Sequence, residues 1–261
     1  MTEPLLSAVT RMSTFRGQQL LTAATCFFFA REERLFAVTS RHVLHDEPTG
    51  HFPDRVELVL HVDATDLTRR AVLSLPLYMD SCALWRQGQD SGGPVDVAVL
   101  EIDRKALPAG VVLRAFEPHN VQLPGAGVEV GASLLVVGFP LGFYDTLHHL
   151  PVVRHAIIAS SFGVRFQGEG YFLTDGRMHR GSSGAPVVMQ WPEGGAALPW
   201  RLLGVHSARM DMARDLVEDE SLGLNCTWYA DILMVLTDAK AVASAAEMGP
   251  RPGRRAAAPR R

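Results

Sequence analysis

The sequence lacks the features that mark several common protein classes. Its three cysteines, Cys26, Cys82 and Cys226, lie far apart and form no C-x-x-C pair. This pattern argues against a disulfide framework and against a zinc knuckle. No apolar run reaches the roughly 18 residues needed to cross a bilayer. The N-terminus has no basic stretch followed by a continuous apolar one, so no signal peptide is expected. These absences predict a soluble protein of the reducing cytoplasm.

Neither the net charge nor any sequence motif indicates binding of nucleic acid, a membrane, a cofactor or a metal. The formal net charge of −3 gives no general case for binding nucleic acid or a membrane. No P-loop, dinucleotide fingerprint or HExxH motif is present, so no cofactor is expected. His148, His149 and His155 lie close in sequence, but no cysteine or carboxylate joins them at ligand spacing. We interpret them as ordinary loop and strand residues and expect no metal.

The last residues, 249–261, form an Arg-rich tail. They read "GPRPGRRAAAPRR", with five arginines and no acid. Proline, glycine and alanine cannot bury a core, so the segment is predicted to be a disordered basic tail. An electrostatic arm that docks a partner is the alternative.

Short apolar segments of strand length run through the first 225 residues, separated by Gly, Pro, Asp and Asn. Examples are "TCFFFA", "RLFAVTS", "VDVAVLEI" and "SLLVVGFP". The exception is residues 229–249, "YADILMVLTDAKAVASAAEMG", which are rich in good helix formers and close on glycine. The expected fold class is all-β with one C-terminal helix.

A domain boundary is predicted where Pro- and Gly-containing segments interrupt the strands between residues 103 and 131. It divides the chain into a first β-rich half, 21–115, and a second half with the C-terminal helix, 125–248. Residues 1–20 remain a separate N-terminal segment. Two halves of similar size suggest paired barrels with a site in the cleft between them.

Two serines lie in glycine-rich contexts that suit a nucleophile, Ser91 in "DSGGP" and Ser183 in "GSSGAP". Acyl transfer needs a hydroxyl activated by an imidazole, a carboxylate that orients the imidazole, and N–H donors for the oxyanion. His42 follows two predicted strands, and Asp96 opens an apolar strand where a carboxylate needs a partner. The turn at Ser183 can bring its own N–H and that of Gly181 to one point, as an oxyanion hole.

The chain resembles the chymotrypsin-fold serine peptidases, and among them the bacterial HtrA-like branch without an appended PDZ domain. The resemblance covers about Ala23 to Leu236. It is carried by "FFFA…LFAVTSRHVL", "VDVAVLEI", "LLVVGFPLGF" and "FLTDGRMHRGSSGAPVV…LLGVHS". It implies two six-stranded β-barrels with a C-terminal helix. It also implies His42 as general base, Asp96 as its orienting acid and Ser183 as nucleophile.

The order His, Asp, Ser excludes Ser91 as nucleophile, because the whole second half would then lie beyond the site. We interpret its segment as a polar loop that enters the Asp96 strand. Ser182 stands where precursor-activated relatives carry an aspartate, and no Ile-Val-Gly-Gly-like start is present. Activation by N-terminal cleavage is therefore not expected. Ala185 replaces the commoner glycine, a change expected to be tolerated.

The resemblance also implies substrate-binding residues. Ser207 would donate a hydrogen bond to the aspartate, and Val205 to Arg209 would form an extended edge that pairs with the substrate backbone. Arg177, six residues before the nucleophile, would lie at the floor of the specificity pocket, with Arg209 in its wall. Guanidinium groups there favour Glu or Asp before the scissile bond. Alternatively, Arg177 turns outward and the pocket takes small apolar residues, or Met178 occupies the floor.

The function that follows is a cytoplasmic serine endopeptidase acting on a protein or peptide. Without a peptide-binding domain in the sequence, target choice could reside in a regulatory or targeting partner. The alternative from another class is a catalytically silent interaction module. An esterase-like hydrolase is disfavoured because G-x-S-x-G on a strand-to-helix elbow is absent.

Overall fold

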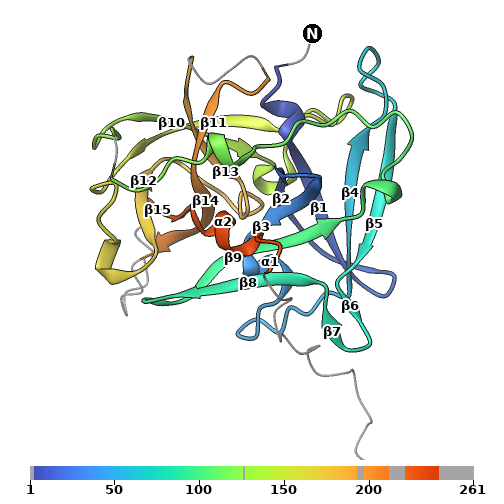
Figure 1. Ribbon diagram of the computed structural model, residues 1–261, viewed down its shortest axis with the longest axis horizontal. Coiled ribbons are helices and arrows are strands. Elements are labelled where there is room, and N and C mark those ends of the chain that lie inside the picture. The colour runs from blue at the N-terminus through green and yellow to red at the C-terminus, as the bar shows by residue number, and fades with distance from the viewer. Residues whose placement is uncertain (1–2, 126, 193–196, 212–220, 241–261) are drawn as a thin grey trace, which may run out of the picture.

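The strands form two antiparallel systems, one in each half of the chain (Figure 1). The computed structural model describes residues 3–125, 127–192, 197–211 and 221–240. The first half is a seven-stranded sheet in the order β5-β4-β1-β2-β3-β9-β8, and the second is a closed barrel in the order β10-β11-β12-β15-β14-β13. This confirms the all-β, chymotrypsin-like fold class.

The strands of the first half are β1 (Val9–Arg16), β2 (Gln19–Arg31), β3 (Arg34–Thr39), β4 (Arg55–His61), β5 (Arg70–Pro76), the short pair β6 (Tyr78–Met79) and β7 (Cys82–Ala83), β8 (Trp85–Asp90) and β9 (Gly93–Ile102). Those of the second half are β10 (Ser133–Gly138), β11 (Val152–Ile158), β12 (Tyr171–Asp175), β13 (Pro186–Gln190), β14 (Trp200–Asp211) and β15 (Ser221–Tyr229). The helices are α1 (Arg41–Leu44) and α2 (Ile232–Leu236), with 3₁₀ turns η1 (Leu6–Ala8), η2 (Arg104–Ala106), η3 (Pro118–Asn120), η4 (Pro140–Gly142) and η5 (Phe166–Gly168).

The N-terminal segment is part of the first sheet, which corrects the expectation that residues 1–20 stand apart. Strand β1 pairs with β2 on one side and with β4 on the other. Met12 and Thr14 on this strand are fully buried. A strand with two neighbours must satisfy its backbone on both edges, so this strand lies inside the sheet. It also makes the first half seven-stranded rather than six-stranded.

The C-terminal helix is much shorter than expected. Tyr229 still belongs to β15, where it pairs with Gly204. Helix α2 has five residues and ends at Thr237, whose hydroxyl donates to the carbonyl of Leu233 at 2.6 Å. The remainder of the expected helix, from residue 241, and the Arg-rich tail lie outside the described residues.

Apolar packing joins the two halves. One buried cluster fills the first sheet and another fills the barrel, but a third draws side chains from both. Phe27 and Phe36 of the first half meet Val188 and Trp228 of the second in this shared cluster. The seam between the halves is therefore a hydrophobic core, and residues that border it are held in fixed positions.

Two further findings concern covalent links and membranes. All three cysteines are free thiols, and burial raises the pKa of Cys26 well above its usual value. Within the described ranges, no helix has the length and apolar character needed to cross a bilayer.

Candidate active site

His42 and Asp96 meet because their strands are neighbours. His42 lies in the single-turn helix α1 directly after β3, and Asp96 lies on β9, which pairs with β3. The ring Nδ1 of His42 is 2.7 Å from Oδ2 of Asp96, and the backbone N–H of His42 donates to Oδ1 at 2.8 Å. One carboxylate thus fixes both the position of the helix and the orientation of the imidazole, leaving Nε2 as the reactive nitrogen.

Ser207 completes the surroundings of this carboxylate. Its hydroxyl donates to Oδ2 of Asp96 at 2.5 Å, as the resemblance implied. Burial raises the pKa of Asp96, but the hydrogen bonds and charge of His42 and the Ser207 hydroxyl outweigh it, so the pKa is lowered. Burial also opposes protonation of His42, yet its bond to Asp96 outweighs that effect, and the pKa of His42 is raised. The pair is built to stabilise an imidazolium.

Ser183 lies in a tight turn between β12 and β13 that only glycine can form. Gly181 has φ of +90° and Gly184 has φ of +83°. A Cβ on Gly181 would lie 2.5 Å from the carbonyl oxygen of Phe139, and one on Gly184 would lie 2.3 Å from that of Thr25. Both positions combine a left-handed backbone with a close backbone neighbour, so the two glycines are needed to form the turn.

The same turn presents two unengaged donors. Among the described residues, the N–H groups of Gly181 and Ser183 find no acceptor. The carbonyl of Arg180 accepts a hydrogen bond from the N–H of Leu141 at 2.6 Å. Because carbonyl and N–H point in opposite directions across a trans peptide, this contact aims the Gly181 N–H away from Leu141. Two such donors on one turn suit an oxyanion.

The Ser183 hydroxyl itself points toward Ser207 and not toward His42. It donates to the carbonyl oxygen of Ser207 at 3.1 Å, and within the described part of the chain no hydrogen bond joins it to His42. Catalytic hydrogen bonds are often formed only in the substrate complex. The Ser183 hydroxyl can change partner by rotation about its side-chain bond, and such rotations are fast.

Thr25 of β2 connects the first half to the catalytic turn, and the sequence did not single it out. Its hydroxyl donates to the carbonyl of Gly181 at 2.7 Å and accepts from the N–H of Phe139 at 3.1 Å. Its own N–H donates to the carbonyl of Ser183 at 3.0 Å. Gly138 makes room for it, since a Cβ there would lie 2.5 Å from the hydroxyl. The only sequence signal is a hydroxyl residue before an apolar strand.

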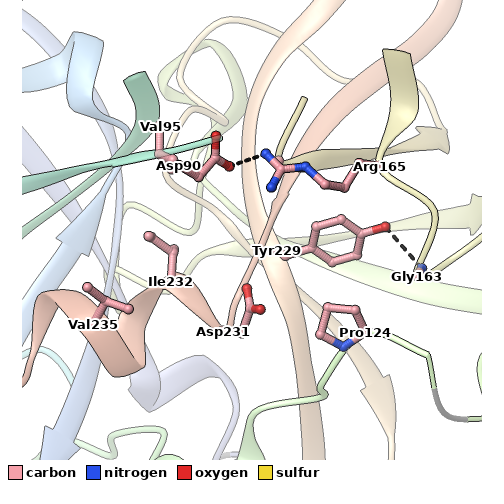
Figure 2. Close-up of a pocket in the computed structure, with 10 residues that line it drawn as sticks. Asp90, Val95, Pro124, Gly163, Arg165, Tyr229, Asp231, Ile232 and Val235 are labelled. Carbon is pink, nitrogen blue, oxygen red and sulfur yellow. Dashed lines mark hydrogen bonds and ion pairs between the residues drawn. The ribbon is translucent and has the colours of Figure 1, made fainter. Parts of the chain in front are cut away.

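Ser91 lies away from this group. It occupies the turn of the β8–β9 hairpin, which is tighter than the expected loop, and its hydroxyl accepts from Nη1 of Arg165 at 3.1 Å. Figure 2 shows the adjoining cavity of about 320 Å³, with the ion pair of Asp90 and Arg165 at 2.5 Å. Val95 lines this cavity, and the next residue along β9 is Asp96. Since successive strand residues point to opposite faces, the cavity lies across β9 from the catalytic carboxylate.

The clustered histidines have separate surroundings. Nδ1 of His148 is 2.8 Å from Oδ2 of Asp145, whereas His149 is buried against Phe139 and Tyr144. Burial lowers the pKa of His149 to about 4. No group of three potential metal ligands is found among the residues that the structure describes.

A cavity of about 350 Å³ contains the expected specificity residues. It is lined by Asp175, Gly176, Arg177, Met178, His179, Arg209, Gly223, Leu224 and Asn225. Arg177 and Met178 thus both line the cavity, whereas the sequence suggested them as alternatives for the floor of the pocket. Met178 is 3% exposed, whereas Arg177 is exposed and forms no ion pair with any described residue.

Val205 is not on a free edge, which corrects part of the expected substrate-binding strand. Its backbone pairs with Pro186 of β13 and with Trp228 of β15, and its side chain is fully buried. His206 is also engaged, since its N–H donates to the carbonyl of Ala185 at 2.9 Å. If this strand has an edge open to a substrate, that edge therefore begins no earlier than Ser207.

Comparisons with known proteins agree with this arrangement. The family described as trypsin-like peptidase domain matches residues 24–191. No curated protein matches significantly. The solved structure of the HtrA-type protease AlgW with a tripeptide is 18% identical with a TM-score of 0.51, covering 88% of this chain and 58% of that one. The serine endoprotease from Yersinia pestis is 16% identical with a TM-score of 0.50, covering 88% and 61%.

At these identities the two structures show the fold, and this chain spans less than two thirds of the length of either. The family match covers most of the chain, including His42, Asp96 and Ser183. The chain belongs to the trypsin-like peptidase domain family.

Proposed function

We propose that the protein is a serine endopeptidase that hydrolyses peptide bonds through an acyl-enzyme. The observation that carries this proposal is the half-buried Asp96–His42 pair together with a turn at Ser183 that has two unengaged N–H donors among the described residues. A binding module has no need for an imidazole held by a carboxylate next to a glycine turn of this kind. The coarser assignment, a trypsin-like peptidase domain, rests on the family match.

The reaction would proceed in two steps. The Ser183 hydroxyl rotates to His42, gives its proton to Nε2 and attacks the peptide carbonyl, whose oxygen moves to the N–H groups of Gly181 and Ser183. His42 then returns the proton to the departing amine as the C–N bond breaks, which leaves the acyl-enzyme. Water, deprotonated by His42, attacks the ester and regenerates the Ser183 hydroxyl. Asp96 stabilises the imidazolium in both steps.

The proposed enzyme is regulated by a partner or ligand. The Ser183 hydroxyl bonds to Ser207 rather than to His42, so the productive contact has still to form. Leu141 and Phe143 lie in one loop and are 69% and 71% exposed. The backbone N–H of Leu141 donates a hydrogen bond to the carbonyl of Arg180. A protein that covers this loop would touch the oxyanion turn directly. Rapid cleavage of an unfolded protein by the isolated chain would contradict such gating.

The proposed substrate is a protein or peptide, and the proposed compartment is the cytoplasm. Three free thiols are compatible with a reducing compartment. The mechanism uses only side chains and water, so the proposal includes no cofactor.

A catalytically silent interaction module is the second candidate, and the missing contact between Ser183 and His42 favours it. A fluorophosphonate probe decides between the two, because it reacts only with an activated serine. The peptidase should be labelled, and the label should disappear in Ser183→Ala and in His42→Ala while Ser91→Ala retains it. A folded chain that is never labelled, alone or with cell extract, would support the silent module.

A further inference from the structure

The cavity of about 350 Å³ is lined by two segments that lead along the chain toward Ser183 or toward its hydrogen-bond partner Ser207. One wall, residues 175–179, runs directly into the catalytic turn, where the N–H of Ser182 donates to the carbonyl of His179 at 3.1 Å. The other wall includes Arg209, two residues after Ser207, whose carbonyl accepts the Ser183 hydroxyl. Any group attached to a carbonyl under attack by Ser183 is therefore within reach of this cavity.

The walls of the cavity are tied together by a buried amide. Nδ2 of Asn225 donates to the carbonyls of Gly176 at 2.8 Å and of Gly223 and Thr174 at 3.2 Å each. Asn225 is 1% exposed, and Met178 anchors the first wall in the barrel core. This amide joins the first wall to β15, and β15 pairs with the second wall through Asn225 and Arg209. The pocket is therefore formed before a ligand arrives, which reduces the cost of binding.

The charged groups around the cavity give it a positive potential. Arg177 and Arg209 line it, and Asp175 is the only acid among the described residues that line it. Burial lowers the pKa of His179, and the charges of Arg154, Arg177 and Arg209 lower it further. Burial and the three arginines thus favour the neutral form of His179, whose imidazole can still donate a hydrogen bond.

In the proposed reaction, two contacts fix the path of the substrate backbone past these groups. Its scissile carbonyl oxygen lies at the N–H groups of Gly181 and Ser183, and its chain extends along the edge that begins at Ser207. The side chain of the residue before the scissile bond then points between the walls that carry Arg177 and Arg209. A side chain that ends in a carboxylate would meet guanidinium groups there.

We propose that this pocket selects glutamate or aspartate before the scissile bond, with Arg177 as the residue that binds the carboxylate. The proposal rests on the peptidase function proposed above. Arg177 forms no ion pair with a described residue, so its guanidinium can offer two parallel N–H donors to a ligand carboxylate. Apolar side chains would meet Met178 but would leave the guanidinium of Arg177 without an ion-pair partner among the described residues.

The test compares fluorogenic peptides that differ only in the residue before the cut: Glu, Asp, Gln, Ala, Val and Leu. The peptide with glutamine is the decisive comparison, since glutamine has the shape of glutamate without the charge. We expect kcat/KM to be at least about tenfold higher for Glu than for Gln, as one charge-assisted contact provides. Arg177→Gln should bring the two peptides within about twofold of each other. Arg114→Gln, an exposed change of equal charge outside the cavity, should leave the ratio unchanged.

Each other outcome overturns the proposal in a recognisable way. If fluorophosphonate labels Ser183 but Glu and Asp peptides are cut no faster than Gln, Ala, Val or Leu peptides, the pocket is not acid-selective and the peptidase stands. If the preference for Glu survives Arg177→Gln, Arg177 is not the residue that binds the carboxylate. If neither labelling nor cleavage occurs, either with the chain alone or with cell extract, the peptidase itself is refuted, and the pocket assignment with it.

Discussion

Replacing Thr25 with valine tests whether the first half positions the oxyanion turn. Valine keeps the shape of the side chain but removes the hydroxyl that bonds to the carbonyl of Gly181 at 2.7 Å and to the N–H of Phe139 at 3.1 Å. Both partners are then left without a bond in a buried region. The carbonyl of Gly181 belongs to the turn whose N–H groups are proposed to stabilise the transition state, so stability and rate should both change.

The size of each effect follows from these contacts. A buried polar group left unsatisfied costs about 1–3 kcal/mol, so two such groups should lower the free energy of unfolding by about 2–4 kcal/mol after partial relaxation. Complete loss of one oxyanion donor lowers kcat by about 10²–10³-fold. Thr25→Val displaces the turn without removing a donor, so we expect kcat to fall about 10- to 100-fold with KM nearly unchanged.

The assay measures kcat, KM and thermal unfolding of Thr25→Val, Thr25→Ser and Thr14→Val. Serine restores the hydroxyl and should recover most of kcat. Thr14 is a fully buried threonine of the same sheet, whose hydroxyl bonds only to the backbone of Thr22 at 3.3 and 3.4 Å. Its replacement should lower stability and leave kcat intact. If Thr14→Val and Thr25→Val lower kcat equally, or serine gives no recovery, Thr25 has no positioning role.

Three further results are expected. Ser183→Ala and His42→Ala should each remove nearly all hydrolysis, and the double variant should be no slower than either single one, because the two residues act as a unit; additive losses would disprove this. Asp96 raises the pKa of His42, so kcat/KM should fall with decreasing pH at a higher pH than for an ordinary histidine. In Asp96→Asn this fall should move to lower pH while kcat drops on the order of 10⁴-fold, which a pH–rate profile would show; an unmoved profile would contradict the assignment. Gly184→Ala should lower the melting temperature and abolish fluorophosphonate labelling, since its Cβ would lie 2.3 Å from a backbone oxygen; a fully labelled variant would refute the need for glycine.

The residues proposed for the chemistry could be named from the sequence because each lies in a local pattern. His42 follows a strand pair, Asp96 opens an apolar strand, and Ser183 stands among glycines that only a tight turn requires. Such patterns depend on a few neighbouring residues and persist in the folded chain. The structure then placed the carboxylate of Asp96 2.7 Å from the imidazole, a distance that no local pattern could supply.

Features that depend on distant partners were missed. Thr25 acts through bonds to residues more than 100 positions away, so nothing near it in the sequence indicates its role. The placement of β1 inside the sheet likewise depends on pairing with β4 across a long intervening segment. Helix α2 was overestimated because helix-forming composition continues past Thr237, where a side-chain bond ends the helix.

The hydrogen bonds and the shared core between the two halves have a consequence for how the protein moves. Thr25 of the first half bonds to the turn that carries Ser183, and Arg165 of the second half bonds to Asp90 (Figure 2) and to Ser91 of the first. Between these ties lies a core built by both halves. The segment that connects the halves is itself packed, since Phe116 pairs with Phe29 of the first half and Val121 pairs with Leu202 of the second. We therefore expect the halves to stay together even after this segment is nicked.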